Sequence, residues 1–279
     1  MSRFASREWF LAGGVVAVLA CAPLAAAPAA KTSAAPPDFS SNQTVWLHPP
    51  GGEFPAVPGS PKPVSNDPAH PYVGNNSGGQ PTYRIGDISN PNLKPWVKEA
   101  MKKDNEEVLA GKIAFSARSS CLPGGIPVFM LFGGQPIYFV QTPKEVLMIY
   151  EGDQQIRRVY LDVPHTANPK PSWYGESVGH YEGDTLVVDT IGLNAKTVVD
   201  SYRTPHTEKM HVTERWRLAE GGKTLEVNIK VEDPDTFNQA WSTMQRYRRG
   251  QQTLSEEVCA ENNTHLFDYH IPVAETPDF

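Results

Sequence analysis

The chain has 279 residues and a formal net charge of −6, and its acidic and basic residues are interleaved along its length. That length allows one large domain or two small ones. Because the basic residues form no stripe or cluster, the composition argues against nucleic acid or an anionic membrane surface as a partner.

The first 30 residues predict an export signal. Arg3 and Arg7 precede an apolar stretch from Phe10 to Leu24, which small residues follow. This stretch is too short for a typical membrane span. Cleavage near residues 25–27 and lipidation of Cys21, in the lipobox-like run 18–21, both stay open. We therefore expect a periplasmic or secreted protein, held at a membrane only if Cys21 is lipidated.

Export changes the interpretation of the cysteines. Apart from Cys21, the sequence contains only Cys121 and Cys259. An even pair in an oxidising compartment favours a disulfide. A metal site built on these two thiols is disfavoured, because they lack the close spacing of zinc-binding cysteines.

Residues 31–94 are rich in proline and glycine, and the run 49–81 within them cannot form a helix or a central strand. The segment could be a linker, but the aromatic residues Trp46, Phe54, Tyr72 and Tyr83 favour an extended arm wrapped on the folded domain. A helix and a connector are expected over residues 95–120. Pro95 suits a first helical position, and Gly111 suits a helix end.

From residue 121 onward the period of the apolar residues is two, which predicts successive β-strands. The expected strands cover residues 127–132, 136–141, 145–151, 154–163, 172–182, 184–192, 209–218, 223–231, 242–249 and 253–260. With no helical pattern between them, they predict a mostly β fold: an antiparallel, up-and-down, lipocalin-like barrel of 8–10 strands over residues 121–279.

Short and long connections alternate between the expected strands. Tight turns are expected at residues 152–154, 182–184 and 219–222, and longer connections begin at Pro164, Leu193 and Glu232. In an up-and-down barrel this alternation places all three long loops at one end, which would form the mouth of a ligand cavity.

The run Gly175–Gly179, GESVG, matches the G-x-S-x-G pattern of the serine-hydrolase nucleophile elbow. An elbow requires a helix directly after the serine. The residues after Ser177 continue the expected strand and then form a Glu-Gly-Asp turn, so we do not expect Ser177 to be a nucleophile.

Four residues are candidates for acid–base catalysis: His165, His206, His211 and Glu214. Both histidines of the repeated Pro-His-Thr tripeptide, His165 and His206, are expected at the mouth. Strand alternation turns Glu214 inward among apolar residues and His211 outward. An inward carboxylate suits a general acid or base, although an ion pair with Arg246 or Arg248 is the structural alternative.

A metal site is a weaker hypothesis. His165 and His206 with Glu208 or Asp200 would make a 2-His-1-carboxylate set, but no fixed ligand spacing supports it. No cofactor is expected, and a divalent metal stays an open alternative. The residues expected to bind a ligand are Trp173, Tyr174, Asp189, Trp216 and Arg246, because several aromatic walls favour an apolar or aromatic molecule.

Several blocks of the sequence resemble a family of exported bacterial β-barrel proteins. The blocks are PSWYGESVGHYEGDTLVVDTIGLN, RTPHTEKMHVTERWRL, VEDPDTFNQAW and CAENN, and the resemblance covers roughly Cys121 to Asn263. The resemblance implies a common fold and a retained pair of cysteines, matching Cys121 and Cys259. It implies no reaction, so it transfers no catalytic residue.

Two functions follow as hypotheses. The first is an exported enzyme that acts on a small apolar or aromatic molecule by acid–base chemistry, as a hydratase, dehydratase, isomerase or lyase. The alternative is a non-catalytic, lipocalin-like binding protein for a small apolar ligand. The ionisable residues expected at the mouth favour the enzyme.

Overall fold

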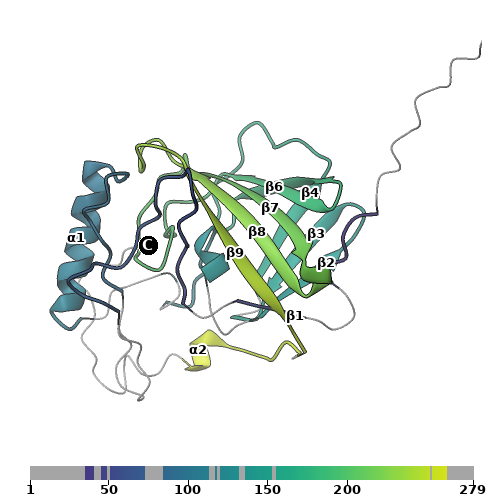
Figure 1. Ribbon diagram of the computed structural model, residues 1–279, viewed down its shortest axis with the longest axis horizontal. Helices are drawn as coiled ribbons and strands as arrows, with labels where there is room; N and C mark the ends of the chain where they lie inside the picture. Colours follow the sequence, from purple (N-terminus) through teal and green to yellow (C-terminus); the bar gives the residue numbers. More distant parts are fainter. Residues whose placement is uncertain are drawn as a thin grey trace, which may run out of the picture. The chain divides into compact units, whose positions relative to one another are not determined.

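The structure is a computed structural model that describes residues 35–40, 45–48, 51–72, 84–112, 117, 120–131, 136–152, 155–251 and 253–262. The expected export signal, Cys21 and Tyr83 lie outside these residues. Nine strands form a closed barrel in chain order (Figure 1). They are β1 (Val45–Leu47), β2 (Pro136–Gln141), β3 (Glu145–Tyr150), β4 (Gln155–Leu161), β5 (Glu176–Glu182), β6 (Thr185–Ile191), β7 (His211–Ala219), β8 (Thr224–Glu232) and β9 (Trp241–Gly250).

The predicted mostly β barrel is confirmed, with one correction to its topology. Strands β4 and β5 pair in parallel, with Val159 beside Ser177 and Leu161 beside Gly179, and every other pair in the ring is antiparallel. The barrel is therefore mixed and not purely up-and-down. A parallel pair requires the connection to return to the end at which the first strand began.

The expectation that all three long loops lie at one end is therefore wrong. The β6–β7 and β8–β9 connections do share an end, as their antiparallel pairing requires. The β4–β5 connection, residues 162–175, runs back along the barrel to the start of β5. Its course is fixed by hydrogen bonds from Asp162 N to Gly179 O and from Ser172 N to Gly192 O.

Two expected strands are absent from the described residues. Residues Val128–Leu131 form the short 3-10 helix η2, all four of them buried, and the segment 253–260 leads into the one-turn helix α2 (Cys259–Asn262). The described part of this apolar run, residues 127–131, is buried throughout, and periodicity alone does not distinguish a buried helical turn from a buried strand. A further short 3-10 turn, η4 (Glu220–Gly222), joins β7 to β8.

The predicted disulfide is confirmed: Cys121 and Cys259 are bonded, with their Cα atoms 5.5 Å apart. The proline-rich segment contributes β1, which closes the ring between β2 and β9. Further along it, Thr243 Oγ1 donates to Pro55 O and Gln245 Nε2 donates to Glu53 O, both at 2.7 Å. We refer to residues 51–72 and 84–94 as the arm.

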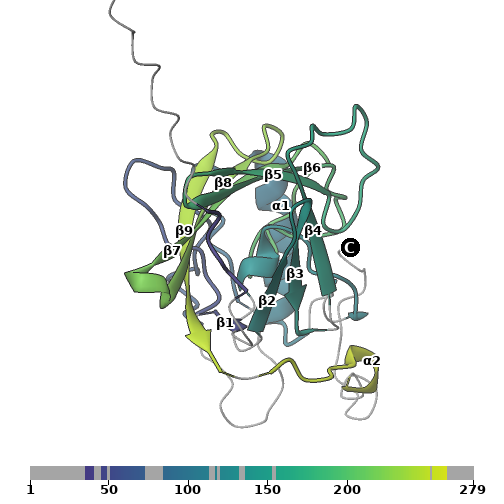
Figure 2. The same ribbon diagram turned by 90° about the vertical axis from the view of Figure 1, so that its right-hand side faces the viewer.

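Helix α1 (Pro95–Leu109) follows the arm and begins at Pro95 as predicted. It lies beside the barrel, with segments of the arm between it and the strands (Figures 1 and 2). Its start is fixed to the β8–β9 connection: Lys94 N donates to Thr236 O, and the indole of Trp96 donates to Asp235 O. Val97, Met101 and Asn105 form its buried face.

Candidate functional site

Glu214 lies inside the barrel, as strand alternation predicts, and it is ion-paired. Arg157 of β4 donates to both carboxylate oxygens, at 2.9 and 2.8 Å, and both side chains are 0% exposed. The indole of Trp216 donates to the same carboxylate at 2.7 Å. A charge this deeply buried requires such pairing, because its desolvation would otherwise cost several kcal/mol.

The Nε and Nη2 groups of Arg157 also donate to hydroxyl groups on β5 and β6. They reach Ser177 Oγ at 3.1 and 3.2 Å and Thr190 Oγ1 at 2.8 Å. Ser177 thus lies within a strand as a hydrogen-bond partner in the barrel interior. We call Arg157, Ser177, Thr190, Glu214 and Trp216 the inner cluster.

The ion pair expected between Glu214 and Arg246 or Arg248 is wrong. Tyr247 of β9 points into the barrel, so its neighbours Arg246 and Arg248 point outward. Arg246, a residue expected to bind ligand, is 57% exposed and pairs with Glu226 at 2.7 Å on the outer surface. Alternation along β4 could have placed Arg157 inward with Val159 and Leu161, but no local signal pairs it with Glu214, 57 residues away.

The barrel axis is occupied by side chains of the protein. The ring of Trp216, another residue expected to bind ligand, packs against Phe139 at 5.6 Å and Tyr247 at 5.8 Å. The Tyr247 hydroxyl donates to Met130 O in η2, and burial raises the pKa of Tyr247 well above its ordinary value. A ligand at this position would have to displace η2 and these rings.

His206 is also buried, in the β6–β7 connection. Its Nε2 accepts from Thr197 Oγ1 at 2.7 Å, and its Nδ1 donates to Thr207 O at 2.8 Å. Burial lowers its pKa, so the ring is neutral at neutral pH. These contacts connect parts of the loop and leave neither nitrogen directed at solvent.

Asp200 lies in the same connection and is fully buried. Its carboxylate accepts from the backbone N–H groups of Tyr202 and Thr204 and from Thr204 Oγ1. Burial raises its pKa to about 6 despite these hydrogen bonds. His165 does not join His206 and Asp200, and in the part of the chain that the structure describes no group of three His, Cys, Asp or Glu residues is arranged to hold a metal ion.

A second group of ionisable residues lies on the outer wall of the barrel, where the β4–β5 connection crosses it. His165 Nδ1 is 3.0 Å from Glu176, and its Nε2 is 3.0 Å from Asp189. His211 Nε2 is 2.8 Å from the same Asp189 oxygen, and its Nδ1 is 3.7 Å from Glu232. These five residues form the outer cluster, whose side chains are 20–40% exposed.

Three of the residues singled out in the sequence thus meet in the outer cluster: His165, Asp189 and His211. Glu176 and Glu232 were not predicted. Burial acts to raise the pKa of Glu176, but hydrogen bonds from Thr166 N and from His165 outweigh it and lower the pKa. Alternation along β5 and β6 could have placed Glu176 and Asp189 on the outward face, but not beside His165.

The two aromatic residues expected at the mouth lie in the β4–β5 connection. Tyr174 packs against Phe129 of η2, with ring centroids 5.7 Å apart, and its hydroxyl donates to Gln155 Oε1. Trp173 is half-buried beside it. Tyr174 therefore packs this connection against η2.

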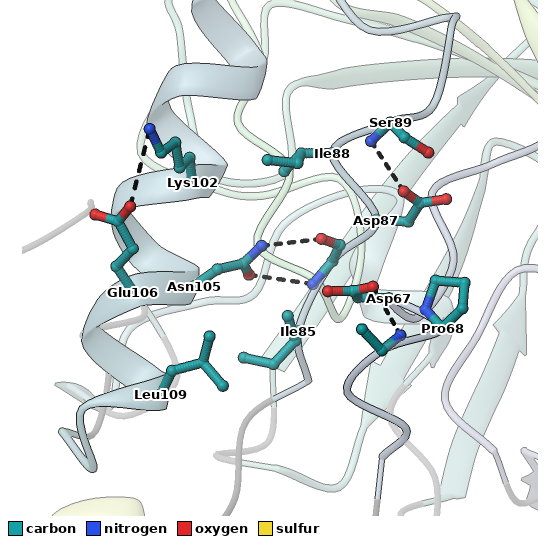
Figure 3. Close-up of a pocket in the computed structure, with 12 residues that line it drawn as sticks. Asp67, Pro68, Ile85, Asp87, Ile88, Ser89, Lys102, Asn105, Glu106 and Leu109 are labelled. Carbon is teal, nitrogen blue, oxygen red and sulfur yellow. Dashed lines mark hydrogen bonds and ion pairs between the residues drawn. The ribbon is translucent and has the colours of Figure 1, made fainter.

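A pocket that sequence reasoning missed lies outside the barrel, between α1 and the arm (Figure 3). Its volume is about 450 Å³. The lining residues are Asp67, Pro68, Ala69, Ile85, Gly86, Asp87, Ile88, Ser89, Lys102, Asn105, Glu106 and Leu109. The arm and α1 supply opposite walls, so the pocket exists only because the two segments pack together.

One contact sets the spacing of these walls. The amide of Asn105 donates to Gly86 O at 2.9 Å and accepts from Gly86 N at 3.1 Å. A Cβ on Gly86 would lie 2.6 Å from Met101 Cε, so only glycine allows this approach without a shift. The signals in the sequence, one glycine and one asparagine, were too general to reveal the pocket.

Among the described residues, no helix is long and apolar enough to span a bilayer. No protein-family model matches the chain, and no curated protein matches it in sequence. The resemblance to a family of exported proteins therefore stays a prediction.

Among solved structures, a mutant of the fluorescent protein UnaG is similar to the chain. The two are 14% identical over 50% of this chain and 88% of that one, with a TM-score of 0.27. A likeness this distant carries no argument about a ligand. The assignment of a closed barrel rests on the strand pairing.

Proposed function

We propose that this protein binds a small molecule without transforming it, and that the pocket between α1 and the arm is the binding site. The pocket carries this proposal, because its volume lies within the range of about 300–1,000 Å³ that is typical of small-molecule sites. It combines apolar walls, such as Ile85 and Leu109, with a few polar groups that could orient a ligand.

The burial and hydrogen-bond partners of two predicted catalytic residues support binding over catalysis. Glu214 is paired with Arg157 out of contact with solvent, and His206 is held neutral between two threonines. A general acid or base must reach the proton that it transfers. Neither residue meets that requirement in this arrangement.

Filling the pocket tests the proposal. We expect a library of small fragments, screened by amide NMR at millimolar concentration, to shift Gly86, Ser89 and Asn105. Leu109→Trp, at the pocket rim, should remove these shifts. Lys103→Trp adds the same ring to an exposed position of α1 outside the pocket and should leave them in place. A screen without pocket shifts, or shifts that survive Leu109→Trp, would contradict the proposal.

A second candidate is the acid–base enzyme, now with the outer cluster as its site. One observation favours it: Asp189 contacts the imidazoles of both His165 and His211, and His211 is 36% exposed. Turnover of any substrate would then be lost in His211→Gln and kept in His180→Gln, a histidine elsewhere on the outer wall. Equal rates in the two variants would exclude this assignment.

We also propose that the protein is exported. The Cys121–Cys259 disulfide supports this, because such bonds persist mainly in oxidising compartments. The intact mass of the protein from its own cells would reveal cleavage near residues 25–27 or a lipidated Cys21. An unprocessed, reduced chain would contradict export.

A further inference from the structure

The walls of the pocket are negatively charged. Asp67 and Asp87 of the arm and Glu106 of α1 supply three carboxylates, against the single ammonium group of Lys102. The two arm carboxylates lie across the pocket from Glu106 (Figure 3). A ligand in the pocket is therefore exposed to negative charge from both walls.

The hydrogen bonds of the two arm carboxylates differ. A hydrogen bond from His70 and another from Ala69 N lower the pKa of Asp67. Asp87 accepts one hydrogen bond at Oδ1, from Ser89 N at 2.9 Å. No described residue donates to its Oδ2, which leaves that oxygen able to accept from a ligand.

Lys102 does not cancel this charge. Its Nζ lies 3.9 Å from Glu106, beyond hydrogen-bond distance, and both side chains are more than half exposed. An exposed pair of this kind contributes little and rearranges readily. Glu106 can therefore turn toward a cationic ligand at small cost.

Most of the remaining lining is apolar. Ile85, Ile88, Leu109 and Pro68 offer carbon surface, and the Asn105 amide is used by Gly86. The pocket thus offers carboxylate oxygens as acceptors and apolar walls for the body of a ligand, and its excess of carboxylates disfavours an anion.

Resting on the proposed function, we infer that the ligand is a small organic cation, an amine or guanidinium carried on a compact apolar body. Its N–H groups bind Asp87 Oδ2 and the carboxylates of Asp67 and Glu106. Its apolar part lies against the side chains of Ile85, Ile88 and Leu109. Hydrogen bonds between charged groups are the strong ones, so the positive charge supplies selectivity for this class.

Three probes of one shape test the charge: benzylammonium, benzyl alcohol and benzoate, titrated at pH 7 while the amides of Gly86, Ser89 and Asn105 are observed. We expect benzylammonium to bind at least about tenfold more tightly than benzyl alcohol and benzoate to cause no shifts, with added salt weakening the cation. Asp87→Asn should weaken benzylammonium about tenfold and leave benzyl alcohol unchanged.

Glu107→Gln is the matched control: it removes one carboxylate from α1 outside the pocket and should change neither affinity. If benzyl alcohol or benzoate binds the pocket as tightly as benzylammonium, the inference about charge is overturned while the proposed binding site stands. If neither these probes nor the fragment library shift the pocket amides, the proposed function itself fails. Thermal unfolding of each variant identifies any loss caused by misfolding.

Discussion

The inner and outer clusters are built on opposite faces of the same three strands, β5, β6 and β7. Ser177, Thr190 and Glu214 point into the barrel, and Glu176, Asp189 and His211 point out of it. Inside, Glu214 and Arg157 are 0% exposed. Outside, the corresponding carboxylates and imidazoles keep 20–40% of their surface in water.

This contrast shows that burial, more than residue type, decides what an ionisable side chain can do. An unpaired charge inside the barrel would be strongly destabilising, so the inner residues are confined to one arrangement. On the outer wall water solvates the charged groups, and the residues can exchange partners at small cost. Candidate chemistry is therefore found outside the barrel axis, in the outer cluster or in the pocket beside α1.

Removing one member of the inner pair should have the largest effect. Arg157→Met leaves the Glu214 carboxylate buried without its cation, and we expect the free energy of unfolding to fall by about 3–5 kcal/mol. Chemical denaturation at pH 7 measures the loss. Arg157→Met combined with Glu214→Leu removes both charges and should cost less than the single change. A double variant less stable than Arg157→Met would contradict this account.

A smaller effect is expected at Asp200, a buried carboxylate whose hydrogen bonds come from neutral donors. Its folded pKa of about 6 exceeds the ordinary value of 3.8, so the folded protein binds more protons than the unfolded chain between these pH values. The contribution of Asp200 to stability therefore declines as pH rises from 3.8 to about 6 and levels off above it.

Asn lacks the charge of Asp200, but its Oδ1 can accept from the same two backbone N–H groups and its Nδ2 can donate to Thr204 Oγ1 in place of the bond that this hydroxyl donates to Asp200. We expect Asp200→Asn to gain stability relative to the wild type across this pH range, by roughly 3 kcal/mol in total. Denaturation curves of both proteins from pH 4 to 7.5 give the difference at each pH. A difference independent of pH would show that Asp200 keeps an ordinary pKa.

The smallest effect is expected in the outer cluster. His165→Gln removes contacts to Glu176 and Asp189 that hold the β4–β5 connection to the wall, at a cost of about 1 kcal/mol or less. Limited proteolysis should cleave residues 162–175 faster in this variant, while the melting temperature changes little. A loss as large as that of Arg157→Met would contradict the distinction between the two clusters.

The sequence by itself determined strands β2 to β9, because alternation of apolar residues is a local property, but it missed β1 and predicted strands at 127–132 and 253–260 that the described residues do not form. It also determined that Glu214 faces inward, since Val212, Trp216 and Leu218 share its parity along β7. The start of α1 followed from Pro95, and the Cys121–Cys259 disulfide followed from the number of cysteines available after export. Each of these depends on neighbours in the chain or on a choice among very few partners.

Only the tertiary structure decided which distant residues meet. Arg157 pairs with Glu214 because β4 and β7 face each other across the barrel, and His165 reaches Asp189 because the parallel β4–β5 pair sends its connection back along the wall. The pocket arises where α1 packs on the arm through Gly86 and Asn105. Side chains far apart in sequence meet through the closure of the whole sheet, and no local pattern carries that information.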